Sequence, residues 1–291
     1  MVSDFEAQVR ATNDKINART GRPLLRAIAV GLVLGGALLV SLILIKELYM
    51  VFAAALIGFT TFELASALRF AGRDVPRIPV LVASLAIVPA AFYWLSAGHW
   101  YVTLAGILLV SLWRIVELAR PSHRVSGIEL LKDLGAGAFV MAYVGFMAGF
   151  TVLLTAQEGG QWWTLAFLIV VVAVDTGAYA TGLTFGKHKM APVISPGKTW
   201  EGFAGSAAAA VIAGVLVAIF MLQQPWWVGI IFGLVLLGTA TLGDLSESLI
   251  KRDLGIKDIS TWLPGHGGFL DRVDSSLLSG AAAYALFLIF A

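Results

Sequence analysis

The sequence predicts an all-α fold, a polytopic integral membrane bundle of about nine transmembrane helices with a cytoplasmic N-terminus. The chain is 59% hydrophobic and only 13% charged, whereas a soluble domain carries about 25% charged residues. Apolar runs of roughly 20 residues recur along the chain, and that length crosses a bilayer core as a helix. The alternating strands of a membrane barrel are not evident in the sequence, and lipid requires the backbone to be satisfied internally, so we interpret these runs as helices.

The distribution of positive charge supports this count and orients the bundle. Hydropathy places the spans near 24–45, 48–68, 78–97, 100–118, 132–154, 163–185, 202–222, 226–249 and 275–291. With a cytoplasmic N-terminus, 19 of the 20 Lys and Arg residues fall on the inner side, and only Lys46 falls outside. Cytoplasmic loops are enriched in these residues, so the pattern favours this topology.

Three segments follow from this topology. Residues 1–22 are polar and mixed in charge, which predicts a cytoplasmic N-terminal arm rather than a cleavable signal. Residues 23–155 form the N-terminal transmembrane helices. Residues 156–291 form a C-terminal transmembrane region that carries the cytoplasmic loops 186–202 and 250–274. Long polar loops on one face of a bundle are usually functional, so we expect catalysis here. The chain has no cysteine, which excludes disulfides and thiolate chemistry.

Carboxylates gather at the two ends of the later loop. Asp244 and Ser248 are four residues apart near the end of one helix, so they share a face. Asp271 and Asp274 are three apart at the start of the last helix and can also share a face. Two helix ends can thus bring together the hard oxygen ligands that Mg²⁺ prefers.

Basic residues surround these carboxylates: Lys251, Arg252, Lys257 and Arg272. Carboxylates to hold a cation, with bases to neutralise phosphate oxygens, are what a metal–polyphosphate site needs. Gly267 and Gly268 permit a close approach of the backbone, while His266 alone favours a structural role. Composition alone leaves open a solvated loop whose charges pair with each other or with lipid head groups.

Asp175 lies inside an otherwise apolar span and shares a face with Tyr179. An aspartate at mid-membrane depth costs about 2.5–3.5 kcal/mol on insertion scales, so it is a functional candidate by default. The alternative is an interhelical hydrogen bond of structural value.

The earlier loop contains Gly197-Lys198-Thr199, which suggests a phosphate-binding P-loop. That motif needs a glycine where Pro192 stands, and no strand is expected before it, so we reject the assignment. We interpret the segment as a basic loop that ends at a helix start, with Thr199 or Ser195 as the cap. A helix N-terminus near Lys198 makes a good anion site.

The ordered pattern from Ser248 to Asp274 closely resembles the signature of the phosphatidate cytidylyltransferases, also called CDP-diacylglycerol synthases. It runs through Ser-Leu-Ile-Lys-Arg and Lys-Asp to Pro-Gly-His-Gly-Gly-Phe-Leu-Asp-Arg-Val-Asp, over 27 residues. The segments around Asp175 and from Ser195 to Gly202 also resemble family features. The first 150 residues resemble the family only in being hydrophobic spans.

The resemblance implies that CTP and phosphatidic acid give CDP-diacylglycerol and pyrophosphate, a step of phospholipid biosynthesis. It implies Mg²⁺, with K⁺ as a possible second cation, a homodimer among membrane lipids, and no nucleic-acid partner. The lipid phosphate is itself the anionic nucleophile, so positioning and charge neutralisation would supply the catalysis. We expect a bacterial cytoplasmic (inner) membrane enzyme whose site faces the cytoplasm.

On this basis we assign catalytic roles to Asp244, Asp271, Lys251, Arg272 and Asp258. Metal ligation falls to Asp244 and Asp271, with Ser248 and Asp274 as helpers. Substrate contacts fall to Lys198, Ser195, Thr199, Arg252, Lys257, His266, Gly267, Gly268, Asp175 and Tyr179.

Three alternatives stay open. A transporter would string its charges along a path through the bilayer, with Asp175 and Asp244 as coupling-ion sites. A lipid-binding scaffold would tolerate neutral loop carboxylates. A related enzyme would act as a transferase or kinase on another lipid phosphate or polyprenol.

Overall fold

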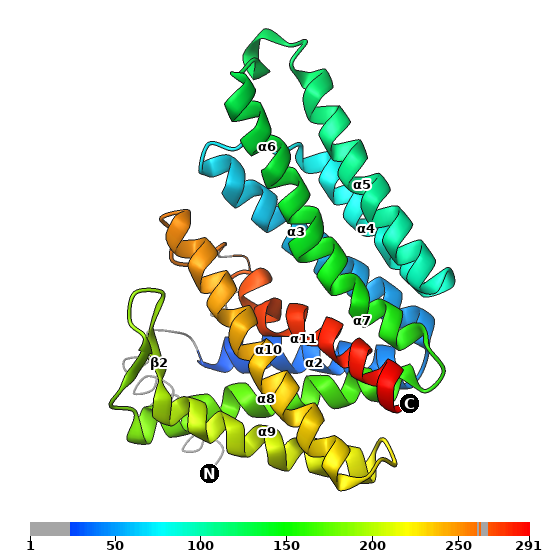
Figure 1. Ribbon diagram of the computed structural model, residues 1–291, viewed down its shortest axis with the longest axis vertical. Coiled ribbons are helices and arrows are strands. Elements are labelled where there is room, and N and C mark those ends of the chain that lie inside the picture. The colour runs from blue at the N-terminus through cyan, green and yellow to red at the C-terminus, as the bar shows by residue number, and fades with distance from the viewer. Residues whose placement is uncertain (1–23, 261, 263–266) are drawn as a thin grey trace, which may run out of the picture.

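A computed structural model describes residues 24–260, 262 and 267–291, and nearly all of them are helical (Figure 1). The helices are α2 (Leu24–Ile43), α3 (Lys46–Phe70), α4 (Arg77–Tyr93), α5 (Leu95–Glu117), α6 (Gly127–Val140), α7 (Met147–Ala156), α8 (Gly160–Phe185), α9 (Trp200–Phe220), α10 (Trp226–Asp253) and α11 (Leu270–Phe290). A 3₁₀ turn η1 (Pro121–His123) precedes α6, and a π-helical turn η2 (Met141–Phe146) joins α6 to α7 in one continuous helix.

The helices have the length and composition of a membrane bundle. Within the described residues, seven are long and apolar enough to cross a membrane: α3, α5, the continuous helix Gly127–Ala156, α8, α9, α10 and α11. Helix α4 is apolar but has only 17 residues, and α2 coincides with the first predicted span. The membrane prediction is therefore supported, while the count of nine spans and the cytoplasmic N-terminus stay predictions. The arm 1–22 lies outside the described residues.

The prediction of a helical fold is supported, but the loop 186–202 departs from it. Strands β1 (Lys189–Ala191) and β2 (Ser195–Thr199) pair there as an antiparallel hairpin with an irregular register. We expected no strand before the helix start, yet β2 leads directly into α9. The two strands satisfy each other's backbone hydrogen-bonding groups. A hydropathy profile does not report such pairing, so it did not predict the strands. Thr199 caps α9 as predicted, because its Oγ1 accepts a hydrogen bond from the Gly202 amide at 3.1 Å.

Two hydrophobic clusters hold the bundle together. The larger joins α2, α3, α4 and α7 to α11, and the smaller joins α3 to α6 and the first half of α11. Helices α8 and α9 lie along the lower part of Figure 1, with the hairpin at one end, α10 rises diagonally from them, and α5 and α6 reach furthest from α8 and α9. Helices α9 and α10 approach closely because they have small residues at their contact. A Cβ added to Gly214 of α9 would lie 2.3 Å from the Gly229 carbonyl oxygen of α10. Such contacts are typical of helices packed in membranes.

Candidate active site

A charged cavity of 480 Å³ lies between α8, α9, α10, α11 and the hairpin. Ten of the predicted site residues line it: Asp175, Tyr179, Lys198, Thr199, Asp244, Lys251, Asp258, Asp271, Arg272 and Asp274. They come from three segments that are far apart in the sequence. The fold therefore brings together the three segments that carry the predicted site residues: the Asp175 element, the earlier loop and the later loop.

Asp244 connects α10 to the hairpin. Its Oδ2 lies 2.6 Å from the Lys198 Nζ, so the lysine of the earlier loop reaches across to the later one. Its Oδ1 accepts a hydrogen bond from the Ser248 hydroxyl at 3.4 Å. The predicted shared face of Asp244 and Ser248 is confirmed.

Lys251 of α10 lies between two carboxylates. Its Nζ is 2.5 Å from Glu247 Oε2 and 2.8 Å from Asp271 Oδ1. The Glu247 side chain is only 1% exposed and that of Asp271 only 7%. Glu247 is not among the predicted site residues, although its position one helical turn before Lys251 was a signal for the pair.

Helices α10 and α11 cross closely at Gly243. A Cβ at this position would lie 2.5 Å from the carbonyl oxygen of Asp274, a separation that real side chains do not adopt. The absence of a side chain at Gly243 thus lets the start of α11 lie beside Asp244. The Asp274 carboxylate is fixed locally, since its Oδ1 accepts from the Ser275 amide at 2.7 Å.

Glu63 of α3 holds the start of α11 in place, a role that the sequence analysis missed. Its carboxylate is buried and accepts the backbone amides of Phe269 at 3.0 Å and Leu270 at 2.9 Å. The Ser260 hydroxyl donates to the same group at 2.5 Å. A helix leaves its first amides unsatisfied, and here another helix supplies the cap. An acid within the apolar run of α3 was the available signal.

The other predicted residues that the structure describes do not line the cavity. Ser248 and Arg252 make structural contacts: the Arg252 Nε donates to the Ile194 carbonyl oxygen at 3.2 Å and ties α10 to the hairpin turn. Ser195 begins β2, and Lys257 is exposed.

The glycines of the later loop shape the turn before α11. Gly267 has a φ of 79°, a left-handed conformation that favours glycine. The Gly268 amide donates to Asp271 Oδ2 at 2.8 Å, so the turn orients this carboxylate. His266 lies outside the described residues.

The formal charge of the cavity is strongly negative. Its lining holds three cationic side chains, Lys198, Lys251 and Arg272, against six carboxylates: Asp175, Asp244, Glu247, Asp258, Asp271 and Asp274. The formal excess is three negative charges. Clustered carboxylates in a membrane protein need partners, and oxygen donors of this kind suit Mg²⁺. The donor set therefore fits a bound cation.

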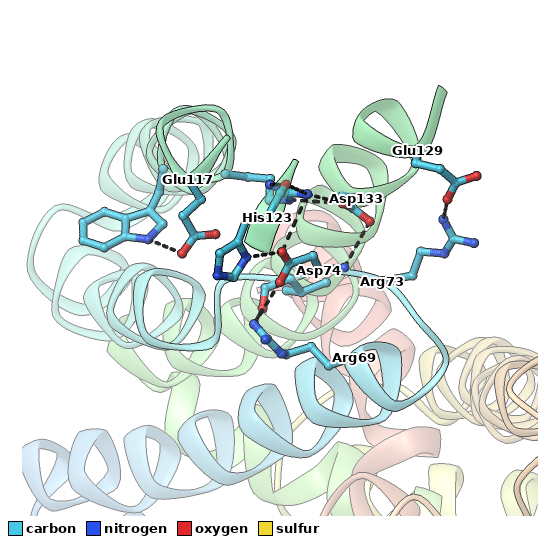
Figure 2. A network of polar contacts seen from close by, with 10 residues as sticks. Arg69, Arg73, Asp74, Glu117, His123, Glu129 and Asp133 are labelled. Atoms are coloured by element: carbon cyan, nitrogen blue, oxygen red, sulfur yellow. Dashed lines mark hydrogen bonds and ion pairs between the residues drawn. The ribbon is translucent and has the colours of Figure 1, made fainter. Parts of the chain in front are cut away.

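A second polar cluster joins the α3–α4 turn to the ends of α5 and α6 (Figure 2). The buried Arg114 donates to Asp133 Oδ2 at 2.8 Å, and Arg69 forms an ion pair with Asp74 at 3.1 Å. Asp74 also contacts His123 Nδ1 at 2.5 Å. Arg114 and Asp133 therefore form a buried ion pair that joins the end of α5 to α6.

Comparison with known proteins decides the family. The sequence model of the cytidylyltransferase family matches residues 25–290. The chain belongs to the cytidylyltransferase family. It is 38% identical to a phosphatidate cytidylyltransferase of Mycobacterium leprae over 280 residues, which cover 94% of this chain and 90% of that protein. It is 37% identical to the phosphatidate cytidylyltransferase of Mycobacterium tuberculosis over 276 residues, 92% of this chain and 83% of that protein.

A more distant relative shows the same family over a shorter stretch. The phosphatidate cytidylyltransferase of Brucella suis is 43% identical over 157 residues, 54% of this chain and 57% of that protein. The family match from residue 25 also extends the likeness beyond the C-terminal region. The first 150 residues of this cytidylyltransferase thus share more with the family than their hydrophobicity.

Proposed function

We propose that this protein transfers the cytidylyl group of CTP to phosphatidic acid and releases CDP-diacylglycerol and pyrophosphate. The observation that carries the proposal is the charged cavity, in which carboxylates and bases from α8, β2, α10 and α11 converge. Family membership and relatives named phosphatidate cytidylyltransferase support the choice of substrates.

The reaction needs little covalent chemistry from the protein. An oxygen of the lipid phosphate attacks the α-phosphorus of CTP, and the bond from that phosphorus to the bridging oxygen of the β-phosphate breaks. The nucleophile is already anionic, so the site must position two anions and neutralise their charge. The side chains available for this are Lys198, Lys251 and Arg272, together with the capped N-terminus of α9.

The carboxylates have two functions in this proposal. Asp244 and Asp271 hold Lys198 and Lys251 at the cavity wall, which fixes where phosphate oxygens are met. Asp244, Asp271 and Asp274 would also hold Mg²⁺. The Ser248 hydroxyl would orient Asp244 through its hydrogen bond to Oδ1. When bound, the ion neutralises phosphate charge and aligns the reacting groups. A monovalent K⁺ beside it would bring the formal excess of three negative charges to zero.

The proposal includes the side of the membrane to which the cavity opens and the oligomeric state of the protein. CTP is a cytosolic solute, so the cavity would open to the cytoplasm, in a bacterial inner membrane, as the distribution of Lys and Arg favours. Phosphatidic acid would enter from the surrounding lipid. We expect a homodimer, and chemical cross-linking in membranes tests it.

One assay tests the function. Purified protein is supplied with CTP labelled in the cytosine ring, phosphatidic acid and Mg²⁺, and the lipid phase is analysed for label. The proposal predicts labelled CDP-diacylglycerol that requires all three additions. A folded protein that transfers no label would refute it, and label transfer only to a polyprenol phosphate would favour the alternative transferase.

A further inference from the structure

A second cavity, of 260 Å³, lies among α2, α3, α7, α8 and α11. Its lining is almost wholly apolar and includes Phe52, Leu56, Phe167, Leu168 and Leu277. One lining residue, Val172, is 64% exposed, so the cavity opens onto the lipid-facing surface of the bundle. A concave apolar site open to lipid can receive a hydrocarbon chain.

Helix α11 separates this apolar cavity from the charged one. At about 100° per residue, one arc of the helix carries Asp271, Asp274 and Ser275, which line the charged cavity. The opposite arc carries Val273, Ser276 and Leu277, which line the apolar cavity.

Arg272 lies at the border of these two arcs and lines both cavities. Within the described residues, Lys198 and Lys251 are each ion-paired, whereas the Arg272 guanidinium makes no ion pair. It is also exposed. An unpaired guanidinium is a bidentate donor for phosphate oxygens.

We infer that the apolar cavity holds the first part of an acyl chain of the lipid substrate, while the lipid phosphate binds Arg272. The inference rests on the proposed function, and it assigns the two substrates to opposite faces of α11. The nucleotide lies in the charged cavity, the lipid chain lies in the apolar one, and the reacting phosphates meet at Arg272.

The size of the cavity limits what it can hold. Pockets for whole drug-sized ligands have about 300–1,000 Å³, and this one has 260 Å³. Only the glycerol-proximal part of one chain therefore fits, and the rest of the lipid stays in the bilayer beyond Val172.

A filling substitution tests the inference by kinetics. In Ala148→Phe, the ring enters the apolar cavity from α7. The KM for dioleoyl phosphatidic acid should rise about tenfold, equivalent to about 1.4 kcal/mol. The KM for CTP should stay within about twofold. Dibutanoyl phosphatidic acid, whose four-carbon chains occupy only the part of the cavity nearest Arg272, should lose much less. Equal losses for both lipids, or a KM change for CTP alone, would overturn the inference.

The design needs two further variants. If Ala148→Phe does not fold, Val172→Trp at the exposed rim replaces it with the same expected split between the two lipids. The matched control is Ala55→Phe, at an exposed position of α3 outside the cavity lining, which should leave both KM values unchanged.

A binding measurement separates this inference from the proposed function. Phosphatidic acid with a diazirine near the carboxyl end of its acyl chain is photolysed with the wild-type protein. Cross-links within 52–57 and 167–172, competed by unlabelled lipid, would support the inference even without turnover. Cross-links confined to other segments would overturn it. Failure of the wild type to form CDP-diacylglycerol would instead refute the proposed function.

Discussion

Two polar clusters in the same bundle use the same kinds of side chain in different proportions. The cluster of Figure 2 together with the neighbouring Lys132 has four carboxylates (Asp74, Glu117, Glu129 and Asp133), four basic side chains (Arg69, Arg73, Arg114 and Lys132) and His123. In the charged cavity, six carboxylates face three cations. The first cluster is balanced within itself, whereas the second is short of positive charge.

Charge balance and open volume distinguish a structural polar cluster from a ligand-binding site. Arg114 is 1% exposed and Asp133 is 3% exposed, and each satisfies the other. The charged cavity has open volume, an unbalanced charge and an unpaired guanidinium at Arg272. A balanced cluster stabilises the fold, while an unbalanced one needs a ligand to complete it.

The largest effect is expected at the unbalanced cluster. Asp271→Asn should lower kcat/KM by at least about 100-fold, because it removes a charge that pairs with Lys251 and that would hold the cation in the proposed function. The measurement is label transfer from CTP to lipid. Asp253→Asn, an exposed position at the end of α10 outside the cavity, is the control and should stay within about twofold of wild type. Full activity of Asp271→Asn would remove this residue from the mechanism.

The balanced cluster should respond in stability instead. Arg114→Met leaves the buried Asp133 without its partner and should lower the free energy of unfolding by about 3–5 kcal/mol. Thermal unfolding in detergent measures this, and kcat at a temperature where the variant is folded should be unchanged. The exposed Arg124→Met is the control. A folded Arg114→Met with a large loss of kcat would show that the two clusters do not differ as described.

Glu63 of α3 caps the start of α11, so a substitution there should affect the charged cavity through helix stability rather than through its charge balance. Glu63→Gln removes the negative charge at the start of α11 and should destabilise that end by about 1–2 kcal/mol. Hydrogen exchange of the amides in 267–272 should accelerate, while exchange in α9 should not. Glu47→Gln, exposed in the first turn of α3, is the control, and equal exchange in both variants would exclude a capping role.

The smallest effect is expected at the start of α9. Thr199→Ala removes the hydrogen bond to the Gly202 amide and should lower stability by about 1 kcal/mol. Thr199→Ser keeps an accepting hydroxyl and should restore most of the loss. A thermal midpoint that is lowered equally by both substitutions would assign the effect to the lost methyl group rather than to the cap.

Much of this site could be predicted because helical spacing is regular. The i, i+4 relation of Asp244 to Ser248 and the capping role of Thr199 follow from local geometry alone, and the structure has both contacts. The convergence of Asp175, Lys198 and Asp271 on one cavity was expected from the family resemblance and from a common cytoplasmic face.

The remaining features depend on contacts between distant segments. Glu63 and Phe269 are 206 residues apart, and no local pattern indicates which acid will cap which helix. The hairpin β1–β2 is stabilised by pairing across a loop that hydropathy treats as polar coil. The apolar cavity beside Arg272 exists only after five helices pack, so no single motif indicates it.

Photo-cross-linking tests most directly whether CTP binds in the charged cavity. A photoreactive CTP analogue is bound with Mg²⁺ to the wild-type protein, irradiated, and the modified peptides are identified by mass spectrometry. We predict cross-links within 174–206 and 240–275 that unlabelled CTP abolishes. Competed cross-links within 69–133 instead would place the nucleotide at the balanced cluster and contradict the account.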